Sequence, residues 1–212
     1  MNNQYSDALT SDAAKVLYEL ISTAKFLRNF VFVGGSALAM YLHHRKSEDL
    51  DFFTWDKEQF NKRQILQYID RFNEKEILNE DADILDLRLN TTKVTFFNAG
   101  WKFLKPDTIN NFNIASLEAI ASMKIHVLFL RAKYRDYYDL YFITKKIGVK
   151  NIFNMAKNAI PGLTLKLFCM ALLYIDDIED DSIAHLEPVE VISKKEIRNF
   201  LQECLLKEGL LL

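Results

Sequence analysis

The first fifty residues alternate between a helical and a strand-like hydrophobic pattern. Apolar residues recur at helical spacing from residue 12 to residue 30, which predicts an opening helix. The apolar run 30–33 is short and rich in aromatic and β-branched side chains, so it predicts a buried strand. Gly34-Gly35-Ser36 ends this run and helix formers follow, with Ser36 as the expected N-cap. The pattern therefore predicts a strand that turns sharply into a helix.

The next segment carries two acidic residues in a strand-like pattern. Residues 49–54 begin with polar and apolar positions in alternation, which is typical of a half-buried strand. Side chains two positions apart on a strand share a face, so Asp49 and Asp51 are expected to point the same way. Residues 56–72 then predict an amphipathic helix.

Residues 84–90 and 93–98 predict two strands joined at Thr91-Thr92 as a hairpin. A two-residue turn there would place Arg88 opposite Thr95 and Asp86 opposite Phe97. The residues expected on the core face are Leu85, Leu87, Leu89, Val94 and Phe96, and those on the other face are Asp86, Arg88, Lys93 and Thr95.

After an irregular stretch, 99–113, the pattern becomes almost wholly helical. One helix is expected from residue 116 to 131 and a second from 135 to 147, ending at Gly148, and further helices follow to residue 212. The sequence thus predicts an α+β protein with a mixed-sheet lobe, 1–113, followed by an all-helical lobe, 114–212.

Composition narrows the class of protein. The 212 residues are 50% hydrophobic and 26% charged, which favours a folded chain over a disordered one. Positive and negative residues nearly balance, at 27 and 29, so binding of nucleic acid or membrane by overall charge is not supported. The chain starts with polar residues and has no apolar run of about 20 residues, so neither a secretory signal nor a membrane span is predicted. The two cysteines, Cys169 and Cys204, are interpreted as reduced core thiols. Together these features predict a cytoplasmic protein.

The stretch that suggests chemistry is Gly34-Gly35-Ser36, followed by twelve residues and then Asp49-Leu50-Asp51-Phe52. A glycine-serine turn at a helix start can bring backbone N–H groups and a hydroxyl against phosphate oxygens. Two carboxylates on one strand face can hold Mg²⁺, and two such ions can clamp a displacement at phosphorus. Each half alone is more often a structural feature, but the two in this order favour nucleotidyl transfer.

These residues and several later blocks resemble the polymerase-β-type nucleotidyltransferase superfamily and, within it, the AbiEii/AbiGii toxin family. The matching blocks are 33–39 with Arg45, 47–53, 93–97, 121–124 and 135–142. The resemblance implies a two-lobe nucleotidyltransferase that moves an NMP from an NTP with Mg²⁺, as two ions. Characterised relatives are toxins of toxin-antitoxin or phage-abortive systems, some of which modify tRNA 3′ ends. It therefore also implies a possible tRNA acceptor and a possible antitoxin partner.

The resemblance also assigns site residues. The metal carboxylates fall on Asp49 and Asp51, and the phosphate turn on Gly35 and Ser36. The family's functional lysine falls on Lys124, and its Arg-Asp-x-x-Asp motif on Arg135, Asp136 and Asp139. Lys124, Arg135 and Asp136 are expected to bind the nucleotide, and Lys124 and Asp139 to act in catalysis. Asp139 could serve as general base or orient the lysine.

The residues themselves allow two interpretations of this second group. If one continuous helix carried Lys124, Arg131 and Arg135, they would form a basic stripe able to neutralise a triphosphate. In the other interpretation, Arg135 and Asp139 are an ordinary intrahelical ion pair.

One position departs from the superfamily pattern. Many members place a third metal carboxylate on a following strand, where this chain has Thr95. Asp86 shares the predicted face of Thr95 and is an alternative metal ligand, or else a solvated strand-face residue. Water and NTP phosphates could also complete the coordination of Mg²⁺.

Charge clusters bear on possible partners. Residues 116–150 hold seven Lys or Arg against three acidic residues, a patch that could steer RNA or NTP. Residues 176–190 hold seven acidic residues and no Lys or Arg, which is typical of a solvated loop but could meet a basic antitoxin. Two other functions stay open: transfer to a small molecule such as an aminoglycoside or to a protein, and a catalytically degenerate nucleotide-binding or regulatory module.

Overall fold

A computed structural model describes residues 5, 7–178 and 182–211 of the chain. It divides into two compact units, Met1–Ser116 and Leu117–Leu212. The first contains a sheet and helices, and the second is built from helices, so the predicted α+β class is confirmed. Each unit is described below by itself.

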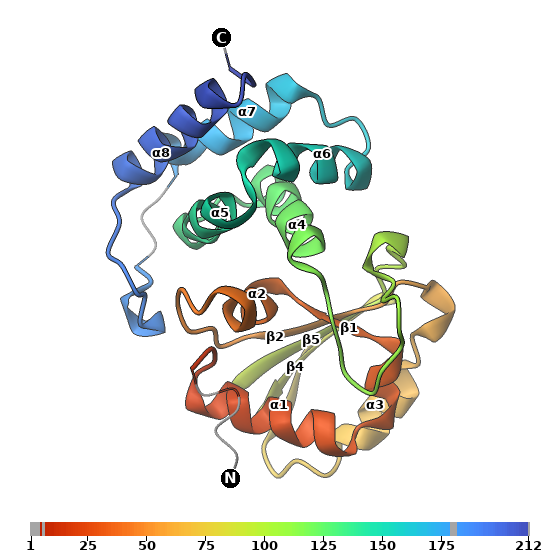
Figure 1. Cartoon of the computed structure of the whole chain (residues 1–212). Helices are drawn as coiled ribbons and strands as arrows, with labels where there is room; N and C mark the ends of the chain where they lie inside the picture. Colours follow the sequence, from red (N-terminus) through yellow and green to blue (C-terminus); the bar gives the residue numbers. More distant parts are fainter. Residues whose placement is uncertain (1–4, 6, 179–181, 212) are drawn as a thin grey trace. The chain divides into compact units, whose positions relative to one another are not determined.

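The first unit is built on a mixed six-stranded sheet (Figure 1). The strands stand in the order β3-β4-β5-β2-β1-β6. Neighbours β2 and β5, and β1 and β6, run parallel, whereas the other pairs are antiparallel. The strands are β1 (Val31–Val33), β2 (Leu50–Phe53), β3 (Lys75–Glu80), β4 (Ile84–Leu89), β5 (Thr92–Phe97) and β6 (Asn113–Ile114).

Helices α1 (Ser11–Thr23) and α3 (Lys62–Ile69) lie on one side of this sheet (Figure 1). Aromatic side chains fill the core between these helices and the sheet. The Phe26 ring meets Phe96 of β5 edge-on at 5.8 Å between centroids and Tyr68 of α3 at 5.3 Å. The apolar positions expected on the core face of the hairpin are all fully buried, which confirms that prediction.

Two helices are shorter than their hydrophobic patterns suggested. The opening helix ends at Thr23 because Ala24 leaves the helical conformation, and a 3₁₀ turn, η1 (Lys25–Asn29), then buries Phe26 and Leu27. The helix expected over 56–72 is split into η2 (Lys57–Gln59) and α3. The reason is a second cap: Asn61 accepts a hydrogen bond from the Gln64 amide and starts α3 afresh.

The predicted hairpin exists, but its register is wrong by two residues. Asp86 lies opposite Thr95, and Arg88 lies opposite Lys93. The turn is Asn90-Thr91 instead of Thr91-Thr92, because Asn90 adopts a left-handed conformation (φ 52°) that asparagine tolerates in two-residue turns. A shift of two keeps each side chain on its predicted face, so the core face is correct although the partners are not.

Two strands have no counterpart in the sequence prediction. Strand β3 is exposed along its whole length and lacks an apolar alternation, and it is held in the sheet by pairing with β4. Strand β6 (Asn113–Ile114) begins at the last residue of the stretch expected to be irregular and pairs with β1 over two residues. Neither strand has a local hydrophobic signal.

The second unit is all-helical within the described residues. Helix α4 (Leu117–Leu130) contacts three others, namely α5 (Tyr134–Ile147), α6 (Val149–Ala159) and α7 (Leu165–Leu173). Helix α8 (Lys194–Lys207) packs on α5 and α7, and the short turns are η4 (Tyr174–Asp177) and η5 (Ala184–Leu186). α8 begins with a complete capping box formed by Ser193 and Glu196.

A continuous helix through Lys124, Arg131 and Arg135 is not observed. Helix α4 ends at Leu130 and α5 begins at Tyr134, so the two separate helices expected there are confirmed, and the condition for a basic stripe on one helix is not met. The acidic segment 176–190 includes η4 and η5, and Asp176 pairs with Arg198 at 2.6 Å. Residues 179–181 of that segment lie outside the described part of the chain.

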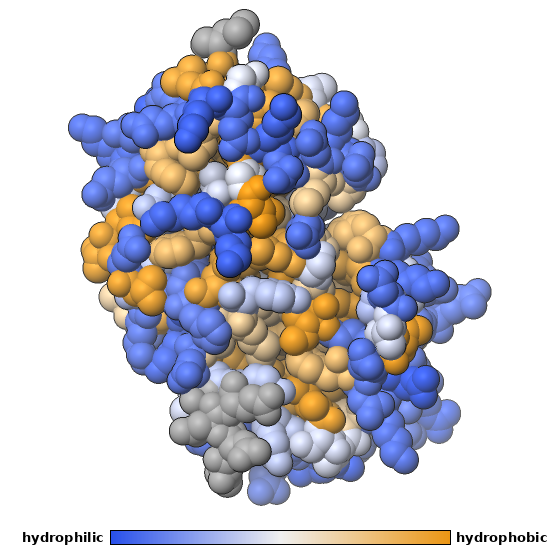
Figure 2. Space-filling model, in the orientation of Figure 1, coloured by the Kyte–Doolittle hydropathy of each residue, from blue (hydrophilic) through white to orange (hydrophobic). Residues whose placement is uncertain are grey.

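Other sequence expectations can be compared with the described residues. Both cysteines are free thiols, and burial raises their pKa above the ordinary value. None of the described helices is long and apolar enough to span a bilayer. Charged and apolar side chains intermingle on the surface (Figure 2), and the exposed apolar residues of the first unit include Tyr18 and Phe103.

Candidate active site

The turn between β1 and helix α2 (Gly34–Leu42) lies directly against Asp51. Strand β1 ends at Val33, which is the register partner of Asp51 on β2. Gly34 follows with a φ of +75°, a conformation that residues with a Cβ rarely adopt. A Cβ at Gly34 would also overlap the Asp51 carboxylate. Glycine is therefore required here both by backbone conformation and by the close approach of the acid.

Gly35 lies beside a buried arginine. A Cβ at Gly35 would lie 2.8 Å from Arg45 Nη2 and 3.2 Å from Ser47 Oγ. Arg45 is only 4% exposed, and its Nη1 donates to the Lys46 carbonyl at 2.9 Å. The turn therefore has a guanidinium and a hydroxyl against one glycine and a carboxylate against the other.

Ser36 does not cap helix α2. The helix begins at Gly34 and Val33 occupies the N-cap position, so the expected cap is wrong. The Ser36 hydroxyl instead donates to the backbone carbonyl of Asp49, and the side chain is fully buried. This bond ties the first turn of α2 to the entry of β2, and it therefore positions the carboxylates relative to the turn.

Asp49 and Asp51 flank the start of β2. Both are half-buried, whereas Leu50 and Phe52 between and after them are in the core. Asp51 lies within the strand, whereas Asp49 directly precedes its first residue, so a shared strand face for the two carboxylates stays a prediction. Within the described residues no group of three or more His, Cys, Asp or Glu is close enough to hold a metal ion. Two carboxylates beside a glycine turn at a helix start are the oxygen ligands that Mg²⁺ commonly shares with substrate phosphates.

A row of three polar residues crosses the sheet at Asp51. Thr95 on β5 is the neighbour of Asp51, and Asp86 on β4 is the neighbour of Thr95. Thr95 donates to Asp86 at 2.7 Å, and Lys93 lies 3.8 Å from the same carboxylate oxygen. Since strands are spaced about 4.8 Å apart, Asp86 is about 10 Å from Asp51 between backbones. The structure therefore joins Asp86 to Thr95, not to Asp51.

The second unit buries a lysine between two aspartates. Lys124 of α4 is 7% exposed, whereas Asp136 and Asp139 of α5 are fully buried. The Lys124 ammonium lies 2.9 Å from Asp136 Oδ1 and 2.5 Å from Asp139 Oδ2. The predicted residues are thus brought together, but as a cluster that joins two helices.

Two residues adjacent to Asp136 on α5, Tyr137 and Arg135, have different environments. Burial, and secondarily the charge of Asp136, raises the pKa of Tyr137 above its ordinary value, and the neutral phenol donates to the Ala171 carbonyl at 2.8 Å. Arg135 is half-buried and makes no hydrogen bond or ion pair with another described side chain. An intrahelical pair between Arg135 and Asp139 is therefore not observed; Asp139 pairs with Lys124.

Comparison with known proteins identifies the family. The model of the family described as "Nucleotidyl transferase AbiEii toxin, Type IV TA system" matches residues 15–103 and 101–208. The chain belongs to this family. The resemblance found in the sequence is thereby confirmed, and the AbiEii chain is an enzyme of the nucleotidyltransferase class.

Relatives of this AbiEii chain cover most of its length. The uncharacterised protein aq_aa25 of Aquifex aeolicus (strain VF5) is 27% identical over 92% of this chain and 98% of its own. A candidate nucleotidyltransferase from H. pylori has a TM-score of 0.54 at 19% identity and covers 96% of this chain and 100% of its own. The antibiotic-resistance factor ANT(2'')-Ia has a TM-score of 0.53 at 13% identity, over 70% of this chain and 92% of its own. These two structures show that the fold is shared.

Sequence reasoning gave no role to Arg45 and Ser47. Both lie in the loop between α2 and β2, and both contact the position where a Gly35 side chain would be. Arg45 is part of one of the matching blocks, and it lies between two apolar segments. These two features were the only indication in the sequence that it could belong to the site. Its burial against the glycine turn depends on how the loop folds back, which no local pattern indicates.

Replacing Gly34 by alanine is expected to abolish most nucleotidyl transfer by this AbiEii chain and to lower its stability. The methyl group would meet the Asp51 carboxylate, and φ of +75° would be strained. We expect a loss of about 1–3 kcal/mol in the free energy of unfolding, measured by urea titration. Gly162 has a similar φ of +80° with open space around it, so Gly162→Ala should lose stability through strain but keep transfer activity. Equal activity of Gly34→Ala and wild type would contradict the close approach.

Proposed function

We propose that this chain is a Mg²⁺-dependent enzyme that transfers a nucleoside monophosphate from an NTP to an acceptor hydroxyl, and that it is the toxin of a toxin-antitoxin pair. The observation that carries the chemistry is the pair Asp49 and Asp51 at the start of β2, with the Gly34-Gly35 turn pressed against Asp51. Family membership supports the role as toxin and an antitoxin as partner.

The reaction assigns a task to each group in the first unit. Bound Mg²⁺ would neutralise charge on the triphosphate and on the attacking oxygen. Asp49 and Asp51 would hold the metal, while the Gly35 amide at the start of α2 would donate to phosphate oxygens. Ser36 would act as a positioning residue, because its hydroxyl is bonded to the Asp49 carbonyl.

Atoms and charge balance in a single displacement. The acceptor oxygen forms a bond to the α-phosphorus, and the bond from that phosphorus to the bridging oxygen of pyrophosphate breaks. Pyrophosphate leaves with the electron pair, and the acceptor's proton passes to solvent or a basic side chain. We propose no residue of the first unit as that base.

The cluster in the second unit supports a more indirect role. Lys124 is proposed to interact with the nucleotide, as the family motif implies, but its ammonium is already held by Asp136 and Asp139. We therefore propose that Asp136 and Asp139 orient Lys124. In this proposal Asp139 is a positioning residue and not a general base. Arg135, which makes no side-chain ion pair within the described residues, is proposed to bind the triphosphate.

Asp86 is proposed as a support for Thr95 and not as a direct ligand of the ion held by Asp51. Thr95 and Lys93 already bond its carboxylate, and a strand separates it from Asp51. The third coordination position would then be filled by water or the substrate, which is common for Mg²⁺.

The acceptor is proposed to be tRNA, as for some relatives of the family. A different acceptor is suggested by the fold shared with ANT(2'')-Ia, one structure of which was solved in complex with adenylyl-2''-tobramycin. That complex has a TM-score of 0.52 at 14% identity, so it supports a common fold and leaves the acceptor of this chain to experiment.

A labelling experiment tests both the reaction and the acceptor. The protein is incubated with Mg²⁺ and each α-labelled NTP, in parallel with total tRNA, tobramycin or protein alone. Label on tRNA that is absent with Asp51→Asn supports the proposal. Label on tobramycin or on protein would keep the chemistry but replace the acceptor. No label, with no thermal shift from NTP and Mg²⁺, would contradict the proposed transfer and favour a catalytically degenerate module.

A further inference from the structure

We propose that four aromatic residues beside Asp51 form a stacking surface for a nucleobase of an RNA acceptor. The residues, here called the aromatic platform, are Phe53, Phe97, Trp101 and Phe103. The inference rests on the proposed nucleotidyl transfer and narrows it, because a surface that stacks flat π-systems selects a nucleic acid over an aminoglycoside or a protein hydroxyl.

The aromatic platform shares a sheet face with Asp51. Phe53 is two residues after Asp51 on β2, and Phe97 is two residues after Thr95 on β5. Side chains two apart on a strand lie on the same face, about 7 Å along it. Phe53 and Phe97 are register partners, as are Asp51 and Thr95. The two rings are therefore the next pair along the strands on the face that carries Asp51.

The rings contact one another in sequence and reach the surface. The centroid distances are 5.1 Å for Phe53–Phe97, 5.7 Å for Phe53–Trp101 and 5.5 Å for Trp101–Phe103. Trp101 and Phe103 are stacked, with only 21° between their planes. Phe53, Phe97 and Trp101 are half-buried and Phe103 is 41% exposed, which leaves ring surface open to a ligand.

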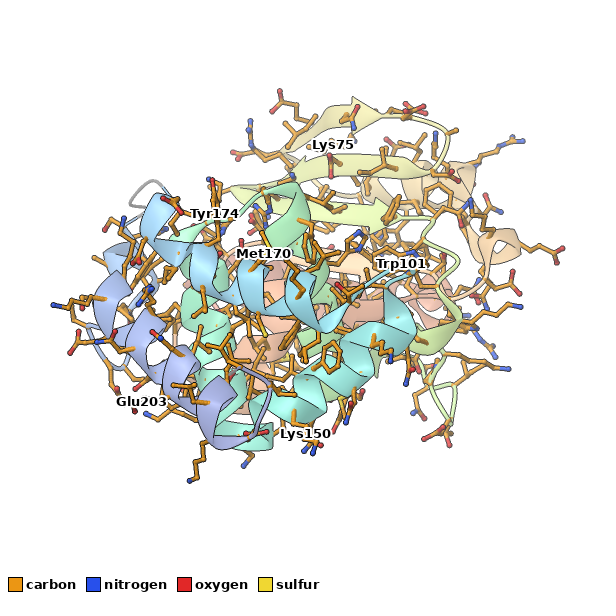
Figure 3. The ribbon with its side chains drawn as sticks, turned by 90° about the horizontal axis from the view of Figure 1, so that it is seen from above. Lys75, Trp101, Lys150, Met170, Tyr174 and Glu203 are labelled. Carbon is orange, nitrogen blue, oxygen red and sulfur yellow. The ribbon has the colours of Figure 1, made fainter. Side chains whose placement is uncertain are left out.

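Buried hydrogen bonds hold Trp101 in place. Trp101, labelled in Figure 3, is on the loop after β5, and its amide donates to the Thr54 carbonyl at 3.3 Å. The Gly100 amide donates to the Thr54 hydroxyl at 3.2 Å, and that hydroxyl donates to Asn98 Oδ1 at 3.1 Å. Thr54 is fully buried, so the loop that carries the indole is fixed to the end of β2.

The position of the aromatic platform favours the acceptor over the NTP. In the proposed reaction pyrophosphate leaves toward the Gly34-Gly35 turn, which follows β1. An in-line displacement brings the acceptor oxygen to the opposite side of phosphorus. In the strand order β1-β2-β5, the side of Asp51 away from β1 is β5, which carries Phe97 and leads to Trp101. A base of the acceptor would therefore lie over the aromatic platform.

Lysines interleave with these aromatic residues. Lys102 and Lys105 are exposed on the same segment, and neither forms an ion pair with another described residue. Lys57 lies against the Gly100 turn, where a Cβ would be 2.6 Å from its Cγ, and it forms a loose pair with Asp83 at 3.7 Å. Cations beside stacking rings are the arrangement that holds single-stranded nucleic acid.

Tryptophan fluorescence reads the aromatic platform directly. The chain has two tryptophans, and Trp55 is in the core, so Trp55→Phe leaves Trp101 as the reporter. We expect single-stranded RNA carrying the 3′-terminal sequence of tRNA to quench this signal at saturation. Adding Phe103→Ala should weaken RNA affinity about 10-fold, the size typical of one stacked base. Tyr18→Ala, which removes an aromatic ring 56% exposed on α1, is the matched control and should not change it.

Kinetics distinguish this inference from the proposed function. With RNA as acceptor, Phe103→Ala should raise KM for RNA about 10-fold and leave KM for the NTP unchanged. Quenching by RNA together with an inactive wild-type enzyme would support the aromatic platform and contradict the proposed transfer. Transfer to RNA with no quenching and no effect of Phe103→Ala would overturn the aromatic platform alone. Equal quenching by NTP or tobramycin without RNA would also overturn it.

Discussion

Asp51→Asn is expected to lower the rate of nucleotidyl transfer at least about 100-fold. The substitution keeps the volume of the side chain, but it removes the negative charge that would hold Mg²⁺ beside the Gly34 turn. The same change at Asp49 should have a comparable effect, because Asp49 is half-buried directly before β2 and is proposed to hold the same metal ion. The measurement is the initial rate of label transfer at saturating NTP, with and without added Mg²⁺.

A matched control separates chemistry from folding. Asp70→Asn removes an aspartate whose side chain is 74% exposed in a surface pair with Lys75, so it should retain full activity. Asp51→Asn should remain folded and melt close to the wild-type temperature, because asparagine has nearly the size of aspartate and still forms hydrogen bonds. An Asp51→Asn protein that is folded and retains more than about a tenth of the activity would contradict the assignment of Asp51 as a metal ligand.

Lys124→Met is expected to lower the free energy of unfolding by about 3–5 kcal/mol. Methionine preserves the apolar length of the side chain but removes the cation between Asp136 and Asp139, both of which are fully buried. Two fully buried carboxylates would then lose the cation that they share. Urea unfolding followed by far-UV circular dichroism, which detects the loss of helices, gives the change in free energy.

Two further variants test the cause of that loss. Lys157→Met removes a lysine exposed on α6 and should change the free energy of unfolding by less than about 0.5 kcal/mol. Combining Lys124→Met with Asp136→Asn and Asp139→Asn should recover a large part of the stability, because the two buried negative charges are removed together with the lysine. A Lys124→Met protein as stable as wild type would mean that the buried cluster contributes nothing to the packing of α4 on α5.

The local part of the fold followed from the sequence. The strand at 30–33, the alternation of buried and half-buried positions around Asp51, and the helical periods after residue 116 are properties of neighbouring residues. The structure has a strand over Val31–Val33, a strand with alternate burial over Leu50–Phe53, and five α-helices among the described residues of the second unit. The roles of the site residues stay predictions, and the experiments above are designed to test them.

Other features depended on distant contacts. The hairpin register followed from the left-handed conformation of Asn90, and it brought Asp86 opposite Thr95. Strand β3 has no apolar alternation and is defined by pairing with β4. The partners of Lys124 lie 12 and 15 positions away on another helix, where a periodicity within one helix could not indicate them.

By itself, the sequence determined the fold class and the order of the chemical groups along the chain, because hydrophobic period and motif spacing act over a few residues. Tertiary structure decided which groups meet: Arg45 against Gly35, Ser36 on the Asp49 carbonyl, and the aromatic platform on the face of Asp51. These contacts join residues that are separate in the chain, and only the paired strands and folded loops bring them within hydrogen-bond or van der Waals distance.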